Sequence, residues 1–350
     1  MTQRLLLLGT GGIATHHIEE FAAIPECEFV ACADAVPGRA AAFAQKHGIA
    51  KAFASLDEAI AWGEFDAAVN ATPDGVHMET TLALLAAGKH VFCEKPLAQN
   101  YPDALRMVEA AENAGLINMV NLTYRNSPAL QKAREMVAAG DIGNLRHVSA
   151  DYLQSWLVGK YWGDWRTDEK WLWRLSQGHG STGVLGDVGV HILDFATYCA
   201  GESMASLYAD LAVFPKAEGD RIGDYKLDVN DSIVITGRMI SGALATVTAT
   251  RYATGHANDL VLTLSGTRGA VRVETDGKVS KLSACLGKDV DENRWREIET
   301  PPVKRNARRF ADALISGRNG DPSFRRAAEI QKLIDAAFES GEKGGPVKIG

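Results

Sequence analysis

Near its N-terminus the chain reads Leu5-Leu6-Leu7-Leu8-Gly9-Thr10-Gly11-Gly12-Ile13-Ala14, an apolar run that ends in glycines and opens an apolar helix. The six residues from Gly9 match G-x-G-x-x-A, a form of the dinucleotide-binding fingerprint between a strand and a helix. The first glycine makes the tight turn, the second lets the backbone approach a pyrophosphate, and the helix dipole stabilises the phosphate charge. A plain glycine turn would show the same local pattern. We expect cofactor contacts at Gly9, Thr10, Gly11, Gly12 and Ile13.

An acidic residue follows the next apolar run. Asp34 comes just after the predicted strand 29–32, close to where a carboxylate accepts hydrogen bonds from the adenine ribose hydroxyls. A carboxylate there would repel a 2′-phosphate, so the sequence favours NAD and makes NADP the less favoured cofactor. Arg39 could partly offset that repulsion as a further cofactor-binding residue. Its alternative interpretation is a solvated side chain in the first turn of the next helix.

The first 122 residues alternate short apolar runs with segments of helical period. Strands are predicted at 5–8, 29–32, 67–69, 90–92 and 117–120, and helices at 12–23, 38–47, 77–87 and 101–114. Such alternation with short turns is typical of βαβ units and a parallel sheet. We therefore predict an α/β protein whose residues 1–122 form a Rossmann dinucleotide-binding domain.

The chain has 350 residues, which at roughly 150 residues per domain suggests a second domain. From about 205 to 300 the strands are longer and alternate with period two, for example at 232–236, 244–248 and 260–264. Turns at 241–242 and 267–269 suggest an antiparallel meander, and helices are predicted at 127–139, 184–200, 304–316 and 323–340. We predict that 123–350 form an α+β domain with a large, mainly antiparallel sheet, which binds substrate and supports oligomerisation.

Composition excludes several function classes. The formal net charge is −7, so the chain lacks the basic surface that nucleic acids or anionic membranes require, and we expect neither as a partner. The five cysteines are scattered, without a C-x-x-C pair, which argues against a disulfide framework and for a reducing compartment. No apolar run approaches the ~18 residues of a membrane span. We expect a cytoplasmic protein.

Three further segments carry chemically informative residues. They are Ala71-Thr72-Pro73-Asp74-Gly75-Val76-His77, Glu94-Lys95-Pro96 and Gly186-Asp187-Val188-Gly189-Val190-His191-Ile192-Leu193-Asp194. Together they resemble the Gfo/Idh/MocA family of sugar and cyclitol oxidoreductases. The resemblance covers nearly the whole chain, and it extends to Asn121, Tyr124-Arg125, Trp173-Arg174 and the strand-rich 229–274 region. The chain departs mildly from the family at Ser181-Thr182-Gly183, where the family is usually more glycine-rich.

The third segment also makes chemical sense from its spacing. Asp187, His191 and Asp194 stand at i, i+4 and i+7, so they would share one face of a helix that is otherwise apolar. Histidine is the usual base for a hydroxyl proton, and a carboxylate one turn away can orient it. Asp187 could instead be a helix N-terminal acid, His191 a core histidine, and the cluster a divalent metal site, although we predict no metal.

The resemblance implies that Lys95, Asp187 and His191 are catalytic, with Lys95 stabilising the developing alkoxide. Beyond the glycine motif, Asp34 and Arg39, we expect cofactor contacts from the residues Ala71, Thr72, Pro73, Asp74, His77, Glu94, Lys95, Asn121, Trp173 and Arg174. Asp74 could equally cap a helix. For the substrate we expect contacts from Lys95, Tyr124, Arg125, Trp165, Arg166, Asp187 and His191.

Five of the seven tryptophans lie between Trp156 and Trp173. Flat aromatic faces suit the C–H faces of a sugar ring, but an ordinary core or a subunit interface would explain the cluster equally well. A sheet with a free face usually needs covering, so we expect a homodimer or homotetramer formed through the C-terminal sheet.

These expectations combine into an NAD-dependent dehydrogenase. It would transfer hydride between a ring secondary alcohol or hemiacetal carbon of a sugar or cyclitol and NAD, with His191 as general acid/base. Two alternatives stay open at this point. One is an NAD-dependent glycoside hydrolase that oxidises its sugar transiently, and the other is a non-catalytic NAD-binding sensor.

Overall fold

The computed structural model describes residues 2–350, which form two compact units. The first unit runs to Leu122 and includes Lys304–Gln331, and the second comprises Thr123–Val303 and Lys332–Gly350. The segment Lys304–Gln331 therefore differs from the prediction that 123–350 form one domain. The reason is long-range packing, because Phe310 and Leu314 of α9 (Asn306–Ser316) join the core of the first unit.

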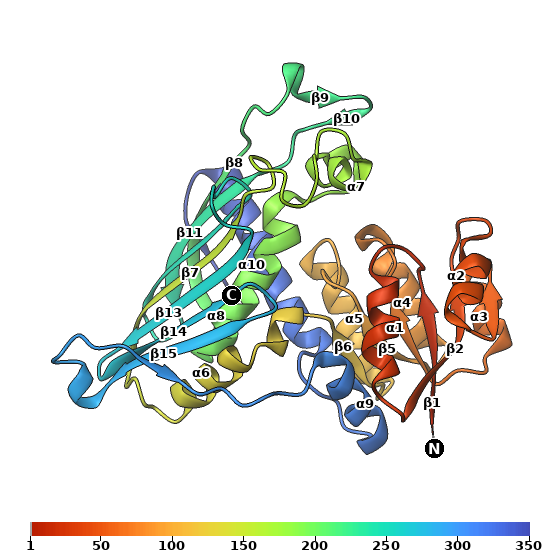
Figure 1. Cartoon of the computed structure of the whole chain (residues 1–350), viewed down its shortest axis with the longest axis horizontal. Coiled ribbons are helices and arrows are strands. Elements are labelled where there is room, and N and C mark those ends of the chain that lie inside the picture. The colour runs from red at the N-terminus through yellow and green to blue at the C-terminus, as the bar shows by residue number, and fades with distance from the viewer. Residues whose placement is uncertain (1) are drawn as a thin grey trace. The chain divides into compact units, whose positions relative to one another are not determined.

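A six-stranded parallel sheet forms the centre of the first unit (Figure 1). Its order is β3-β2-β1-β4-β5-β6, with the bounds β1 (Gln3–Leu8), β2 (Cys27–Ala33), β3 (Lys51–Phe53), β4 (Ala67–Asn70), β5 (His90–Cys93) and β6 (Asn118–Val120). The helices are α1 (Ala14–Ala22), α2 (Arg39–His47), α3 (Leu56–Trp62), α4 (His77–Ala86) and α5 (Tyr101–Asn113). This Rossmann arrangement confirms the predicted fold class, although the prediction missed β3 and α3.

The core of this unit follows from the strand sequences. All four leucines of Leu5–Leu8 are buried, as expected for a central parallel strand covered on both faces. Leu5 and Leu7 pack in one cluster with Phe21 of α1 and Phe310 of α9. The order of the strands reverses between β1 and β4, so the loops after these strands flank the crevice where α/β sheets bind their ligands.

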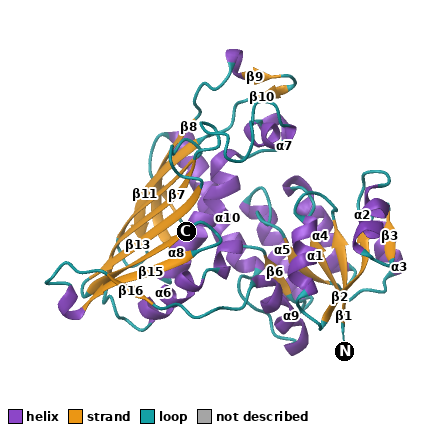
Figure 2. Cartoon of the chain, in the orientation of Figure 1, coloured by secondary structure: helices purple, strands orange, loops and turns teal. Residues whose placement is uncertain are grey.

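A nine-stranded sheet dominates the second unit (Figure 2). Its order is β16-β15-β14-β13-β7-β12-β11-β8-β17, with the bounds β7 (Leu145–Gln154), β8 (Met204–Ala212), β11 (Ser232–Met239), β12 (Leu244–Thr250), β13 (Asn258–Gly266), β14 (Gly269–Thr275), β15 (Ser280–Leu286), β16 (Arg296–Ile298) and β17 (Val347–Lys348). All its pairings are antiparallel except β12 with β7, so the sheet is mainly antiparallel as predicted.

The predicted meander is wrong in one respect. β7 inserts between β12 and β13, so these two strands are not neighbours. This order could not be predicted, because period-two alternation shows which face of a strand is buried but not which strands pair with it.

Helices cover one face of this sheet. α6 (Pro128–Ala138) packs on β14 and β15, and α8 (Val190–Ala200) packs on β7, β12 and β13. α10 (Phe324–Lys343) contains the boundary between the two units, at Gln331. Over residues 2–350, no helix combines the length and the hydrophobicity that crossing a membrane requires.

A smaller cluster of aromatic residues lies within the second unit. α7 (Glu169–Leu172) and the short strands β9 (Arg221–Ile222) and β10 (Tyr225–Lys226) surround it. Trp156, Trp165 and Leu227 are buried in it, and Trp162 and Trp171 pack against it with their rings stacked at a centroid separation of 5.9 Å. Four of the five clustered tryptophans therefore contribute to a local core.

Candidate active site

The glycine turn after β1 has two distinct parts. Gly9 has a φ of +86°, and a Cβ there would lie 2.7 Å from the carbonyl oxygen of Ala71, so only glycine fits this close approach. A Cβ at Gly11 or Gly12 would meet no atom of residues 2–350 within 4 Å. Both glycines are exposed, and apolar Ile13 stands at the N-cap of α1 without a side-chain acceptor. This open, uncapped helix start fits a pyrophosphate.

Asp34 lies beside this turn with its carboxylate held in place. Its Oδ2 accepts hydrogen bonds from the backbone N–H and the hydroxyl of Thr10, both at 2.8 Å, and its Oδ1 accepts from the N–H of Val36 at 2.8 Å. Burial raises the pKa of Asp34, but these hydrogen bonds and Arg39 outweigh it and lower the pKa. Arg39 lies 3.5 Å from Oδ2 and is half exposed. The ionised acid and the half-exposed cation beside it fit the recognition of an adenosine ribose.

The loop after β4 is tied at both ends. Thr72 donates to Oδ1 of Asn70 through its hydroxyl at 2.7 Å, and its carbonyl faces Nε2 of His77 at 2.8 Å. His77 has no exposed surface, and its Nδ1 lies 2.7 Å from the carbonyl oxygen of Pro96. We had expected His77 to line the cofactor. Both ring nitrogens of His77 instead lie within hydrogen-bond distance of carbonyl oxygens in two loops. Pro73 is exposed, and Asp74 begins the short helical turn Asp74–Val76.

Glu94 and Asn121 support the loop that carries Lys95. Glu94 Oε1 lies 2.9 Å from Nε2 of His17 and accepts from Nδ2 of Asn121 at 2.8 Å, and Oε2 accepts from the N–H of Lys95 at 3.2 Å. Burial raises the pKa of Glu94, but His17, Asn121 and Lys95 outweigh it and bring the pKa to about 2. Asn121 is fully buried. Protein groups thus engage the side chains of Glu94 and Asn121, both of which we had expected to bind the cofactor.

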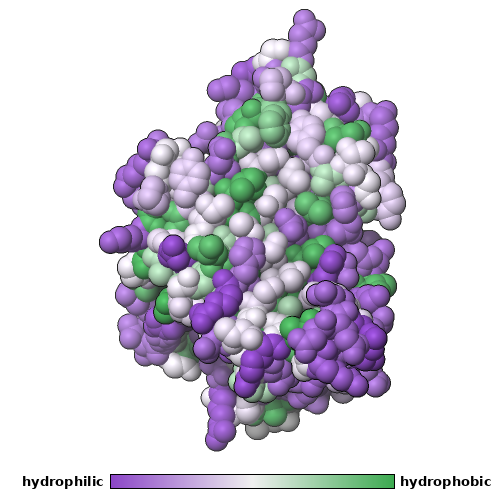
Figure 3. Space-filling view, turned by 90° about the vertical axis from the view of Figure 1, so that its left-hand side faces the viewer, coloured by the Kyte–Doolittle hydropathy of each residue, from purple (hydrophilic) through white to green (hydrophobic). Residues whose placement is uncertain are grey.

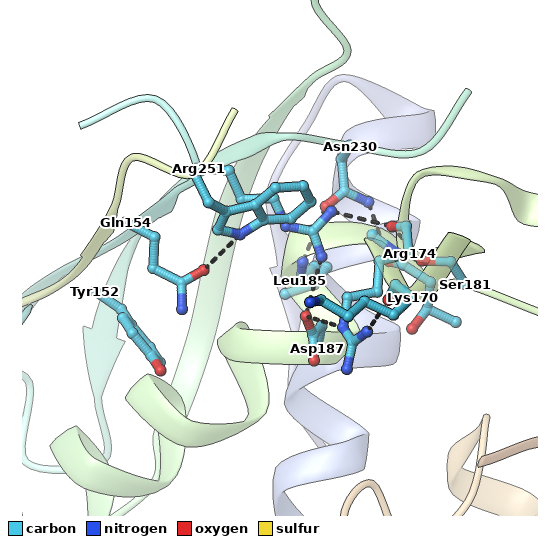
Figure 4. Close-up of polar contacts among 12 residues, drawn as sticks. Tyr152, Gln154, Lys170, Arg174, Ser181, Leu185, Asp187, Asn230 and Arg251 are labelled. Atoms are coloured by element: carbon cyan, nitrogen blue, oxygen red, sulfur yellow. Dashed lines mark hydrogen bonds and ion pairs between the residues drawn. The ribbon is translucent and has the colours of Figure 1, made fainter. Parts of the chain in front are cut away.

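In the second unit Asp187 lies in a π-helical turn, Leu185–Gly189, directly before α8. Asn230 anchors the start of this turn, since its Oδ1 accepts from the N–H of Leu185 at 2.9 Å (Figure 4). A Cβ at Gly186 would lie 1.8 Å from Oγ1 of Thr182, which makes glycine necessary. The π-turn interrupts the helical spacing on which the expected shared face of Asp187, His191 and Asp194 depended.

Two arginines hold Asp187 (Figure 4). Nη2 of Arg251 lies 3.1 Å from Oδ2 of Asp187, and Nε of Arg174 lies 3.8 Å from the same oxygen. Arg251 is fully buried, its Nη1 donates to the carbonyl of Arg174 at 3.1 Å, and its guanidinium lies 4.9 Å from the ring centroid of Trp156. Arg251 directly follows β12 and lies far along the chain from Asp187, so no local spacing indicated this pairing.

His191 is buried in α8 against two tyrosines. Its ring makes an edge contact with Tyr124 at a centroid distance of 5.0 Å, and Tyr152 lies at 6.5 Å. The two tyrosine hydroxyls are 2.6 Å apart. Asn258 binds both of them and also accepts from Nε2 of Gln154 at 2.9 Å. The sequence analysis identified Tyr124 but missed Gln154 and Asn258, which lie on neighbouring strands and meet only in the folded sheet.

Two of the expected substrate contacts, Arg125 and Trp165, are buried among protein groups, whereas Arg166 is accessible. Arg125 is fully buried and forms a two-point ion pair with Asp194, at 2.6 and 2.8 Å. Trp165 is 2% exposed and donates its only N–H to the carbonyl of Leu157 at 3.2 Å. Arg166 is half exposed and stacks on Trp165 with 4.5 Å to the ring centroid. Packing explains Arg125 and Trp165 without a ligand.

Trp173 and Arg174 form a short helical turn after α7. The guanidinium of Arg174 lies 4.5 Å from the ring centroid of Trp173 and is partly exposed beside Asp187. Arg174 therefore faces the Asp187 region, and Trp173 packs against its guanidinium. No group of three or more His, Cys, Asp or Glu side chains in residues 2–350 is arranged to hold a metal ion.

Two family models match the chain. Residues 3–122 match an oxidoreductase family described as an NAD-binding Rossmann fold, and residues 130–272 match the GFO/IDH/MocA C-terminal domain. Levoglucosan dehydrogenase from Pseudarthrobacter phenanthrenivorans is 26% identical, with 96% of this chain and 95% of that protein covered. Inositol 2-dehydrogenase from Rhizobium meliloti is 28% identical, with 97% of each covered. A solved levoglucosan dehydrogenase in complex with NADH superposes over all of both chains with a TM-score of 0.89 and 26% identity.

Proposed function

The chain belongs to the GFO/IDH/MocA family of NAD-binding oxidoreductases, and from this premise we propose that it transfers hydride between a ring carbon of a sugar or cyclitol and NAD. The observation that carries the proposal is the pairing of an open glycine turn beside an ionised Asp34 with a buried His191 flanked by polar side chains. Relatives that act on levoglucosan and inositol support the substrate class.

In this proposal the first unit binds the dinucleotide. The N–H groups around Gly11 and Gly12 hold the pyrophosphate, and Asp34 accepts from the adenosine ribose, which favours NAD over NADP. Bound NAD supplies the hydride acceptor, and NADH the donor for the reverse reaction. Lys95 lies in a loop that Glu94 and Asn121 fix, so its ammonium can serve a defined position.

In this proposal His191 transfers the substrate's hydroxyl proton, and Lys95 binds the oxygen that carries it. In the oxidation, His191 would take the substrate's hydroxyl proton, and Lys95 would hydrogen-bond the same oxygen and stabilise its developing negative charge. The carboxylate of Asp187, which Arg251 orients, accepts a hydrogen bond from a substrate hydroxyl. In the reduction, His191 returns the proton.

An uncharged polyol suits the second unit best. The polar groups beside His191 are hydroxyls and amides of Tyr124, Tyr152, Gln154 and Asn258, which match alcohols as donors and acceptors. The guanidiniums of Arg251 and Arg174 already face Asp187. A sugar phosphate would have to compete with that carboxylate.

A panel assay tests the proposal. Aldoses, levoglucosan, inositols and sugar phosphates are incubated with NAD or NADP, and absorbance of the reduced nicotinamide is followed. We expect turnover of neutral polyols with NAD. His191→Ala and Lys95→Ala should lower kcat by about 10²–10⁴-fold while leaving NAD affinity nearly unchanged, as measured by calorimetry. Full activity in both variants contradicts the assignment. In a parallel incubation of aryl glycosides with NAD, release of the aglycone without net NADH would indicate a glycoside hydrolase.

Matched controls exist for both variants. The side chain of His256 is partly exposed, with Nδ1 2.6 Å from Oδ2 of Asp259, and Lys132 is partly exposed on α6 beside Glu135. His256→Ala and Lys132→Ala should both retain wild-type kcat.

We also propose that two copies associate through the outward face of the large sheet. Tyr208, Val234 and Leu244 are 41%, 48% and 50% exposed on this face, and Tyr208 and Leu244 line a hollow together with Thr236 and Thr246. Figure 3, which looks at this side of the molecule, shows hydrophobic surface interspersed with hydrophilic surface. The scattered cysteines favour a cytoplasmic location.

Light scattering after size-exclusion chromatography tests this association. We expect a dimer or tetramer for the wild type and a smaller species for the double variant Val234→Lys/Leu244→Lys. Ile240→Lys, which changes an exposed residue in the adjoining hairpin turn, serves as the control. A monomeric wild type, or an unchanged double variant, would reject this interface.

A further inference from the structure

His77 is unusual among the buried histidines because both of its ring nitrogens face carbonyl oxygens. Nδ1 lies 2.7 Å from the oxygen of Pro96, and Nε2 lies 2.8 Å from the oxygen of Thr72. The side chain has no exposed surface. Water therefore cannot satisfy either nitrogen from outside.

Carbonyl oxygens accept hydrogen bonds and cannot donate them. A neutral imidazole carries one N–H and one lone pair, so it could satisfy only one of these two oxygens. Its lone pair would then point at the other oxygen within hydrogen-bond distance, in a buried site where an unmade hydrogen bond is costly. Only the doubly protonated ring donates to both.

The surroundings act in the same direction. Burial lowers the pKa of His77, but Cys93, Asp74 and the carbonyl of Pro96 raise it, and the net result is a pKa of about 10. His90, in the same unit, shows the opposite pattern. Its Nδ1 accepts from the N–H of Ile117 at 3.0 Å, and burial lowers its pKa.

The two carbonyls belong to loops that follow adjacent strands. Thr72 follows β4 and is held from its other side by Asn70, and Pro96 follows Lys95 after β5. Ala71, next to Thr72, also supports the close approach of Gly9. His77 thus joins the loop that adjoins the glycine turn to the loop that carries the lysine.

We propose that His77 is a positioning residue, a permanently protonated brace between the Thr72 and Pro96 carbonyls that holds Lys95 in its working position. The role for Lys95 rests on the proposed function, whereas the charge of His77 does not. The two parts can therefore be tested separately.

Nitrogen NMR of histidine-labelled protein tests the charge. Comparison with His77→Gln assigns the His77 ring, and His90 serves as an internal reference. We expect both nitrogens of His77 to carry protons at pH 8, where the ring of His90 is neutral. A neutral His77 ring at pH 8 would refute the proposal that this side chain donates hydrogen bonds to both carbonyls. This result does not require a known substrate.

Kinetics of His77→Phe and His77→Gln test the positioning. Phe fills the ring volume without donors, and Gln cannot donate in two opposed directions. We expect kcat to fall by ~10²-fold, since small displacements of a reacting group cost about that much, while the Kd for NAD changes far less. His90→Gln is the matched control and should keep wild-type kcat.

The outcomes separate the two proposals. If the folded His77 variants keep wild-type kcat, the positioning role is wrong and the proposed function survives. If the wild type turns over no substrate of the panel, the proposed function fails, and the NMR result still decides the charge. If the variants do not fold, as judged by circular dichroism, the loss exceeds a positioning effect and contradicts the role proposed here.

Discussion

Nη2 of Arg251 lies 3.1 Å from Oδ2 of Asp187, and this arginine has no exposed surface whereas the Asp187 side chain is 27% exposed. The buried guanidinium of Arg251 thus orients the partly accessible carboxylate of Asp187. Arg251 itself stacks on Trp156, whose indole N–H donates to Oε1 of Gln154 at 3.2 Å. The orientation of Asp187 therefore depends on a core that extends from the end of β12 to β7.

Replacing Arg251 tests this dependence. In Arg251→Met, Asp187 loses the guanidinium that lies 3.1 Å from its Oδ2, while Arg174 lies farther away, at 3.8 Å, so the carboxylate is less firmly oriented. We expect kcat/KM to fall by about 10–10²-fold, with a smaller change in NAD affinity. Arg272→Met, at a half-exposed position of β14, is the control. Unchanged kcat/KM in a folded Arg251→Met protein would exclude the positioning of Asp187 by Arg251.

The Arg125–Asp194 pair predicts a stability effect. Both side chains are almost fully buried, so Asp194→Asn leaves an uncompensated guanidinium and should lower the free energy of unfolding by about 3–5 kcal/mol in urea titrations. The double variant Arg125→Met/Asp194→Leu removes both charges and should be more stable than the single variant. Asp210→Asn, on the exposed side of β8, is the control. A double variant less stable than Asp194→Asn would count against this account.

Glu94 predicts a pH dependence in acid. Its pKa is about 2 in the folded protein, against 4.5 as its ordinary value, so its stabilising effect is fully present above pH 4.5. This contribution is lost as the pH falls from 4.5 toward 2, because the unfolded chain binds the proton first. In Glu94→Gln the free energy of unfolding should therefore fall by a few kcal/mol less than in the wild type over this pH range. Glu109→Gln, on the exposed side of α5, should follow the wild type, and an identical curve for Glu94→Gln would refute the prediction.

Asp34 predicts a change in cofactor preference. Asp34→Asn keeps one acceptor oxygen, for the N–H of either Thr10 or Val36, and removes the charge that repels a 2′-phosphate. We expect the NADP/NAD ratio of kcat/KM to rise by about tenfold or more, equivalent to roughly 1.4 kcal/mol. Asp57→Asn in α3 is the control. A ratio that stays constant would indicate that Asp34 does not contact the ribose.

Local pattern in the sequence determined the elements and the cofactor turn. The helix predicted at 101–114 runs from Tyr101 to Asn113, and its N-cap Asn100 accepts from the N–H of Asp103 at 2.9 Å. The Rossmann fold and the glycine turn could be predicted because hydrophobic period, caps and tight turns each depend on a few neighbouring residues. Lys95, Asp187 and His191 could be named as candidates from the sequence because each lies in a short local motif.

Only the tertiary structure decided which partner each polar side chain meets. In the folded protein β7 lies between β12 and β13, Lys304–Gln331 belongs to the first unit, and Asp194 pairs with Arg125. It also turned His77 from an expected cofactor contact into a link between two loops. These outcomes depend on residues distant in the chain, whose contacts arise from packing and from the need to satisfy buried polar groups. No local spacing encodes such contacts, so the sequence alone could name these residues but not their partners.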